Sequence, residues 1–168
     1  MGKELLTMLE SDVRIVQLEP MNMAMASGFG PSPEGEAWKK LQTWASSQGL
    51  LDNLGAHRYF GYNNPSPAPG SPNYGYDQWM TVGQEVKASL EVRLFNFPGG
   101  LYAVTRCQLK NITETWGQLA LWRENSPYLG ADHQWLEECL TPEVFLKQTV
   151  TPVEEAVFDL YLPVQTED

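Results

Sequence analysis

The chain contains a long-range internal repeat, and this feature limits its possible folds more than any other. Four pairs of similar segments occur in the same order, at offsets from 76 residues (57 to 133) to 82 residues (76 to 158). This spacing is longer than the period of solenoid repeats and therefore predicts a duplicated half-domain. The pairs are "DVRIVQL" (12–18) with "EVRLFNF" (91–97), "EAWKKLQTW" (36–44) with "ETWGQLALW" (114–122), "HRYFGY" (57–62) with "HQWLEE" (133–138), and "YDQWMTV" (76–82) with "FDLYLPV" (158–164).

Each half has the same expected order of elements: two strands, a helix and two more strands. We predict an α+β fold in which two β-β-α-β-β repeats are related by a pseudo-two-fold axis. The strands form an antiparallel sheet, both helices pack on one face, and a ligand cleft lies between the halves. Repeat one covers about 12–83 and repeat two about 90–164, within one domain at 12–168 that follows an N-terminal arm at 1–11. The predicted strands are 13–18, 22–28, 57–62, 75–82, 91–97, 101–107, 133–140 and 156–163.

The helices are marked by caps and by apolar spacing. Ser32 before Pro33 is typical of a helix N-terminus, and Gly49 is typical of a helix end. In the second half we expect Thr113 to cap the helix that carries "ETWGQLALW". A further short helix is predicted at 142–148. Apolar residues at helical spacing normally face a core, which is the simplest interpretation of the two tryptophan stripes.

Charge and motif content exclude several classes of function. The formal net charge is −10 and the eleven basic residues are scattered, which argues against direct nucleic-acid binding because phosphate contacts need clustered Lys and Arg. The two cysteines, Cys107 and Cys139, lack metal-ligand spacing, so no metal, cofactor or disulfide framework is predicted. No signal peptide or transmembrane run is evident. We therefore expect a soluble, cytoplasmic protein without a membrane partner.

The segment "HQWLEECL" at 133–140 places two carboxylates in a predicted strand, although glutamate is depleted in strands and is rarely buried unpaired. Side chains alternate between faces of a strand, so Glu137 should share a face with Trp135 and Cys139, while Glu138 should face solvent. The repeat aligns Glu137 with Gly61. Because equivalent residues face each other near a two-fold axis, the glutamate should lie opposite this glycine, in a hollow.

An anionic hollow with aromatic walls suits a flat organic cation, since rings attract cations by roughly 0.5–2 kcal/mol each. Strand parity suggests further wall residues around Glu137. The alternative is structural: Glu137 could pair with Arg58, Arg106 or Arg123. The proposed ligand-binding residues are Glu137, Trp135, Cys139, Tyr59, Tyr102, Trp79, Tyr161, Met23 and Trp116.

Over about residues 12–164, the chain resembles the GyrI-like small-molecule-binding domain, which is the effector-binding domain of AraC-type and MerR-type transcriptional regulators. The resemblance is carried by "VRIVQLEP", "FGYNNP", "FPGGLYAVTRC", "ETWGQLALW", "HQWLEECL" and "DLYLPV". It implies that Glu137 contacts cationic or aromatic ligands in multidrug fashion. The usual aromatic positions flanking this glutamate hold Leu136 and Cys139 here. The resemblance also implies a stand-alone sensor or sequestering module that works with a DNA-binding partner domain or as a homodimer.

Two other classes of function stay open. Some stand-alone proteins of this kind resemble hydrolases of reactive electrophiles, which would use Glu137 with Tyr102 or Tyr161 to position water and substrate. Catalytic motifs such as Gly-x-Ser-x-Gly and His-Glu-x-x-His are missing from the sequence, so a binding module is favoured over an enzyme. A protein-binding inhibitor with an acidic surface ranks last, because the acids form no continuous run.

Overall fold

The computed structural model describes residues 12–147 and 149–167. Its centre is one antiparallel sheet of nine strands. The central strands, such as Tyr74–Thr81 and Val157–Gln165, are buried along almost their whole length because one face meets the helices and the other meets a second apolar layer. The strands are β1 (Arg14–Leu18), β2 (Met21–Gly30), β3 (Tyr59–Asn63), β4 (Tyr74–Thr81), β5 (Arg93–Phe97), β6 (Gly100–Gln108), β7 (Leu129–Gly130), β8 (Leu136–Cys139) and β9 (Val157–Gln165).

The strand order confirms the predicted duplication. It runs β1-β6-β9-β8-β3-β4-β2-β5, with β7 paired to β9. Exchanging β1 with β5, β2 with β6, β3 with β8 and β4 with β9 reverses this order, as a two-fold axis between β8 and β3 requires. The first strand of each repeat lies in the other repeat's half of the sheet: β1 pairs with β6, and β5 pairs with β2.

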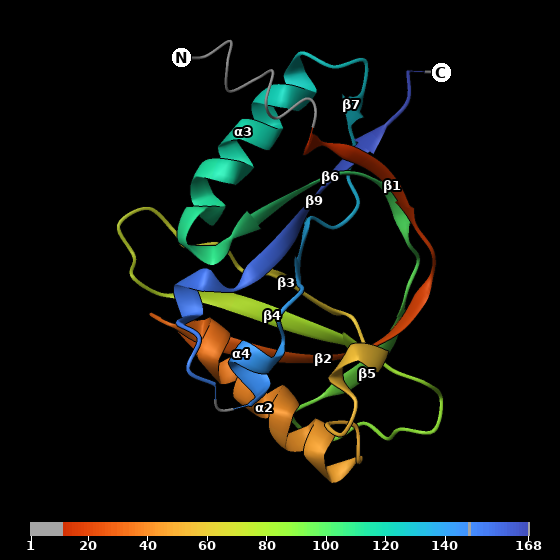
Figure 1. Ribbon diagram of the computed structural model, residues 1–168, viewed down its shortest axis with the longest axis vertical. Helices are drawn as coiled ribbons and strands as arrows, with labels where there is room; N and C mark the ends of the chain where they lie inside the picture. The colour runs from red at the N-terminus through yellow and green to blue at the C-terminus, as the bar shows by residue number, and fades with distance from the viewer. Residues whose placement is uncertain (1–11, 148, 168) are drawn as a thin grey trace.

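Helices α2 (Pro33–Ser47) and α3 (Ile112–Glu124) pack on the same face of the sheet. Figure 1 shows α2 beside β2 and β4, and α3 beside β6 and β9, with the sheet curling away from both helices. Three short elements complete this side: α4 (Glu143–Leu146) contacts α2, and the 3-10 turns η2 (Leu109–Asn111) and η3 (Val153–Glu155) contact each other. A third 3-10 turn, η1 (Leu54–Ala56), precedes β3.

Most element boundaries follow the predicted pattern, with two corrections. Pro33 opens α2, and Gly49 follows its end with a φ of +73°, as expected of a glycine stop. Thr113 is not the cap of α3, because the cap lies two residues earlier, at Asn111, and the helix begins at Ile112. The strand predicted at 133–140 is shorter, since β8 begins only at Leu136. The N-terminal arm predicted at 1–11 lies outside the described residues.

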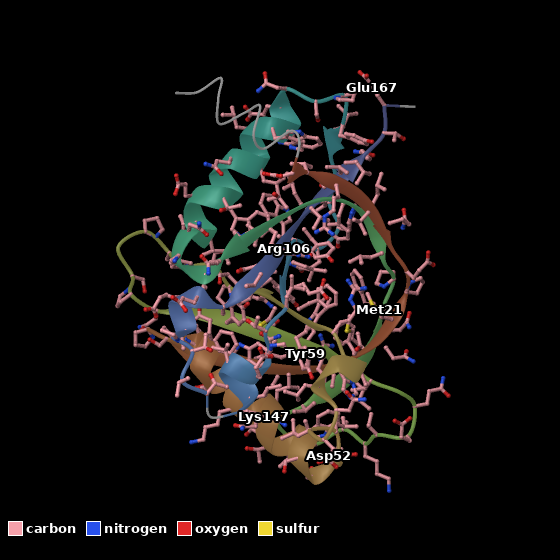
Figure 2. All side chains as sticks on the ribbon, in the orientation of Figure 1. Met21, Asp52, Tyr59, Arg106, Lys147 and Glu167 are labelled. Carbon is pink, nitrogen blue, oxygen red and sulfur yellow. The ribbon has the colours of Figure 1, made fainter. Side chains whose placement is uncertain are left out.

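Apolar side chains fill both faces of the sheet (Figure 2). The face toward the helices contains Ala24, Tyr59, Met80, Leu160 and residues of both helices. The opposite face contains a second cluster, whose buried residues all lie in strands: Leu18, Met23, Phe60, Trp79, Phe97, Tyr102, Val104, Leu136 and Tyr161. Within the described residues, no helix has the length and apolar character needed to cross a membrane.

Candidate ligand-binding site

A cavity of about 860 Å³ opens on the helix face of the sheet, between the two repeats. Its volume falls in the range of about 300–1,000 Å³ that is typical of small-molecule sites. Repeat one contributes α2 and the ends of β3 and β4, and repeat two contributes η2, α3, β8, α4, η3 and β9. We call this space the central cavity. It corresponds in position to the predicted cleft between the halves.

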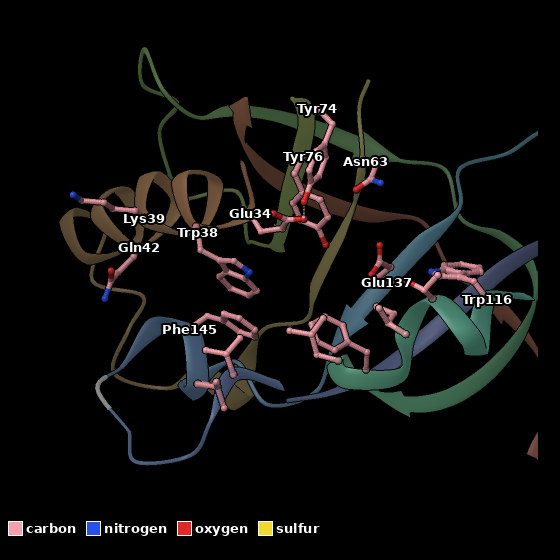
Figure 3. A pocket seen from close by; sticks show the side chains of 17 residues that line it. Glu34, Trp38, Lys39, Gln42, Asn63, Tyr74, Tyr76, Trp116, Glu137 and Phe145 are labelled. Atoms are coloured by element: carbon pink, nitrogen blue, oxygen red, sulfur yellow. Dashed lines mark hydrogen bonds between the residues drawn. The ribbon is translucent and has the colours of Figure 1, made fainter. Parts of the chain in front are cut away.

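Aromatic rings from both repeats line the central cavity. Trp38 of α2 and Phe145 of α4 stack with ring centroids 4.9 Å apart and an interplanar angle of 7° (Figure 3). The side-chain amide of Gln42 donates a hydrogen bond of 2.8 Å to the carbonyl of Leu146, which ties α4 to α2. The complete set of aromatic lining residues is Trp38, Tyr74, Tyr76, Trp116, Phe145 and Phe158.

Glu137 lies on β8 directly opposite Gly61 on β3, as the repeat alignment predicts. Its partly buried side chain points into the central cavity (Figure 3). Among residues 12–147 and 149–167, all ion pairs involve other carboxylates, so no cation neutralises Glu137. Burial, together with the negative charge of Glu34, raises the pKa of Glu137 from 4.5 to about 7. The cavity therefore carries a carboxylate that titrates near neutral pH.

Glu34 is a second carboxylate of the central cavity, and the sequence analysis did not select it. It lies in the first turn of α2 and accepts a hydrogen bond of 2.5 Å from the hydroxyl of Tyr74. Figure 3 shows Glu34 and Tyr76 facing the same space as Glu137. The two carboxylates come from different repeats, and their mutual repulsion contributes to the raised pKa of Glu137. Lys39 also borders the cavity, but it is exposed and points away from Glu137 (Figure 3). The part of the cavity around Glu34 and Glu137 is therefore negative and suited to a positive charge.

The glycine opposite Glu137 has a packing role. A β-carbon on Gly61 would collide with the ring and hydroxyl of Tyr76, which crosses this strand from β4. We expect Gly61→Ala to lower the free energy of unfolding by about 1–2 kcal/mol, because overpacking must displace the ring. Urea denaturation measures this change. The control is Gly117→Ala in α3, where an added methyl meets nothing within 4 Å, so stability should be unchanged or should rise. Equal stabilities would contradict this packing role.

The solvent-facing position predicted for Glu138 is wrong. This carboxylate is buried on the face of the sheet opposite the helices, where Arg58 donates two hydrogen bonds of 2.8 and 2.9 Å. The hydroxyl of Tyr161 donates a third of 2.6 Å. The alternation of β8 is as expected, but the second face of the sheet is also a core. Arg58, which we considered as a partner of Glu137, therefore pairs with Glu138 instead.

The predicted wall residues divide between the two faces of the sheet. Glu137 and Trp116 line the central cavity. Tyr59 and Cys139 share its face, paired across β3 and β8, but are buried in the core beneath it. Four other predicted wall residues do not line this cavity, because they belong to the apolar cluster on the opposite face of the sheet. Alternation along one strand does not tell which face the residues of a neighbouring strand occupy. These four are Met23, Trp79, Tyr102 and Tyr161.

Trp135 borders a second, smaller space of about 290 Å³, which we call the side chamber. Trp135 is 48% exposed, and its ring lies 5.3 Å from that of Trp116, tilted by 38°. Trp116, Asn63 and Glu137 border both the side chamber and the central cavity. Trp135 therefore lies near Glu137, as predicted, although it does not line the larger space.

Sequence reasoning missed most of the repeat-one wall. Trp38 is the repeat equivalent of Trp116 at an offset of 78 residues (38 to 116), so the duplication itself could have identified it. The structure brings both rings to the central cavity from opposite helices. Phe145 carried no comparable signal, because α4 has no counterpart in repeat one.

A curled antiparallel sheet with two helices on one face and a cavity between its duplicated halves defines a GyrI-like effector-binding domain. The family model described as "Integron-associated effector binding protein" (Cass2) matches residues 14–164, and the chain therefore belongs to this family. The resemblance inferred from the sequence motifs is confirmed. No curated protein sequence matches this chain.

Solved structures share the fold at low sequence identity. The C-terminal domain of EcmrR has a TM-score of 0.65 at 11% identity, covering 92% of this chain and 97% of that domain. EcmrR in a DNA complex has a TM-score of 0.67 at 11% identity, with 99% of this chain covered but only 66% of EcmrR. A hydrolase from Listeria innocua has a TM-score of 0.60 at 12% identity, with 92% of each chain covered. SAV2435 bound to tetraphenylphosphonium has a TM-score of 0.50 at 11% identity, covering 92% of this chain.

Proposed function

We propose that this chain binds aromatic organic cations in the central cavity, as a sensor or sequestering module. The observation that carries the proposal is the carboxylate of Glu137, which has no ion-pair partner among the described residues and lies among aromatic rings. The space around it, of about 860 Å³, is in the volume range of small-molecule sites. A ligand cation would neutralise a charge that no Lys, Arg or His of residues 12–147 and 149–167 pairs with. The rings of Trp38 and Trp116 would add stacking and cation–π attraction. The effector-binding family supports a small-molecule ligand.

The proposal predicts a charge-dependent affinity. At about pH 8, where Glu137 is ionised, tetraphenylphosphonium should bind more tightly than neutral triphenylphosphine oxide. Glu137→Gln should weaken binding of the cation about tenfold, because it removes the Coulomb attraction between the phosphonium and the carboxylate, and a loss of about 1.4 kcal/mol is a tenfold change. The neutral compound should be affected less than about twofold. Quenching of tryptophan fluorescence during titration measures both affinities.

The control for this titration is Glu114→Gln, which removes one exposed carboxylate from α3 outside the central cavity. It changes the net charge equally, so it reports any long-range electrostatic effect. Its affinity for tetraphenylphosphonium should match that of the unchanged protein. If both glutamine variants weaken binding equally, or if the neutral compound binds as tightly as the cation, the proposed role of Glu137 is wrong.

Any regulatory role would require a DNA-binding partner domain or protein, which we propose by analogy with EcmrR. That longer protein is described in complex with DNA, and this chain spans 66% of its length. The present chain has a net charge of −10, which does not favour phosphate contacts of its own. A homodimer is a second arrangement that would be compatible with a sensor.

A hydrolase acting on strained electrophiles is the second candidate. It is supported by the pKa of about 7 for Glu137, which is suitable for proton transfer at neutral pH. Tyr102 and Tyr161, which we expected to assist, lie on the opposite face of the sheet. Incubating the protein with an aryl epoxide distinguishes the two functions. Binding without diol formation supports the binding module, whereas turnover that Glu137→Gln abolishes would establish the hydrolase.

A further inference from the structure

The central cavity and the side chamber meet at Glu137. Three residues border both spaces: Asn63 at the end of β3, Trp116 on α3 and Glu137 on β8. The larger space measures about 860 Å³ and the smaller about 290 Å³. A charge held by Glu137 therefore lies at a junction rather than at the end of one cavity. Parts of one ligand could extend from that charge in two directions.

The two spaces differ in chemistry. Away from the junction, rings and aliphatic groups dominate the central cavity, such as the stacked pair Trp38 and Phe145. Away from the junction, the side chamber is bordered by two side chains that donate and accept hydrogen bonds, those of Ser66 and Gln134. Gln134 uses its amide nitrogen in a local bond of 2.9 Å to the carbonyl of Trp135. Its amide oxygen is of the right type to accept a hydrogen bond from a ligand.

From this geometry we infer that the site takes a two-part cation. Its flat aromatic body lies in the central cavity, its positive centre lies at Glu137, and a short arm ending in a hydroxyl or amide lies in the side chamber. The inference rests on the proposed function and narrows its ligand class. Trp116 and Trp135, with centroids 5.3 Å apart, form the aromatic wall along which the arm leaves the charged centre.

The side chamber favours a short polar arm for two reasons. Its volume of about 290 Å³ is at the lower limit of about 300 Å³ for a complete ligand site, so it suits a substituent rather than a separate molecule. A polar arm can also hydrogen-bond to Gln134 or Ser66, whereas an alkyl arm of equal size would cover the half-buried amide of Gln134 without offering it a partner. The expected discrimination between the two arms is therefore a matter of hydrogen bonding and not of size.

Three acridinium cations test this inference: N-methyl, N-propyl and N-(2-hydroxyethyl). The last two have arms with the same number of heavy atoms and differ only in the terminal methyl or hydroxyl group. We expect the hydroxyethyl compound to bind about fivefold more tightly than the propyl compound, since a net hydrogen bond contributes about 0.5–1.5 kcal/mol. Acridinium fluorescence during titration with the full chain at about pH 8 measures all three affinities.

The double variant Ser66→Ala/Gln134→Leu should reduce the hydroxyethyl preference to about one, while the N-methyl compound keeps its affinity. Ser66→Ala alone provides a milder variant if the double variant has altered far-UV circular dichroism. The matched control is Gln118→Leu, which replaces an amide on α3 that borders neither space, and it should keep the full preference.

The outcomes separate this inference from the proposed function. If Glu137→Gln weakens binding of all three cations but the hydroxyethyl and propyl compounds bind equally, the side chamber does not select for a polar arm. The inference then fails. A preference that survives the double variant overturns it as well. If Glu137→Gln weakens binding of none of the three, or if none binds, the proposed function itself fails.

Discussion

Replacing Glu137 with glutamine should make the protein more stable at pH 8, by about 3 kcal/mol. The folded state holds this carboxylate in a cavity where burial and the charge of Glu34 raise its pKa from 4.5 to about 7. Each pKa unit corresponds to about 1.4 kcal/mol of preference for the neutral form. Ionisation at pH 8 therefore costs the folded state free energy that an uncharged glutamine of similar shape does not require.

The pH dependence has a defined sign. The pKa of Glu137 is higher in the folded chain than in the unfolded chain, so the folded state binds the proton more tightly. Its contribution to stability is fully present below about pH 4.5 and is lost as the pH rises through about 7. The difference between Glu137→Gln and the unchanged protein should therefore shrink to less than about 1 kcal/mol near pH 5. Urea denaturation across this range measures the difference.

The exposed Glu114 again serves as the control. Glu114→Gln should leave the free energy of unfolding within about 0.5 kcal/mol of the unchanged protein at both pH values, as is usual for surface substitutions. A glutamine at 137 that stabilises the protein equally at pH 5 and pH 8 would show that the gain comes from packing rather than from ionisation. A destabilising effect at pH 8 would mean that the carboxylate has a partner in the folded chain.

Arg58→Met should lower the free energy of unfolding by about 2–3 kcal/mol. The guanidinium holds the buried carboxylate of Glu138 through two hydrogen bonds, of 2.8 and 2.9 Å, and removing it leaves that charge with only the hydroxyl of Tyr161. Breaking a buried ion pair from one side costs about 3–5 kcal/mol. The side chain of Arg58 is 42% exposed, so water can reach the vacated place and the loss should be smaller.

Two variants show whether this loss comes from the unpaired carboxylate. Arg58 lies over the ring of Phe60, and Arg93 lies in the same way over the ring of Phe95. Arg93 has no carboxylate partner among the described residues, so Arg93→Met removes the contact with the ring without unpairing a carboxylate. It should cost less than about 0.5 kcal/mol. Adding Glu138→Gln to Arg58→Met should restore most of the lost stability. A double variant as unstable as the single one would mean that the packing of Arg58 on Phe60 matters more than its charge.

The repeat made the architecture predictable because each matched segment supplied two elements at once. The helix motif shared by 36–44 and 114–122 gave two helices of equal role, and both pack on one face of the sheet. The alignment of Glu137 with Gly61 required no distance information, since residues equivalent under a two-fold axis must meet where that axis crosses the sheet. This part of the site followed from symmetry alone.

The walls of the cavity were harder to predict because they depend on register. Parity placed Glu137 and Cys139 correctly on one face of β8, but nothing in the sequence says which face of β6 or β9 meets it. Tyr102 and Tyr161 were therefore assigned to the wrong side. The same limit hid the second core, so Glu138 was expected to face solvent. Phe145 was missed because the position of α4 depends on a stack with Trp38, a tertiary contact.

The exchange of first strands between the repeats bears on how such a site can arise. Because β1 completes the sheet of repeat two and β5 that of repeat one, two identical, separate half-length chains could form this sheet only as a homodimer. In that homodimer the two positions nearest the symmetry axis would hold the same amino acid. Two glutamates would repel each other, and two glycines would offer no charge to a ligand. Covalent fusion of the two copies lets these positions diverge, so that one supplies the carboxylate of Glu137 and the other the room at Gly61.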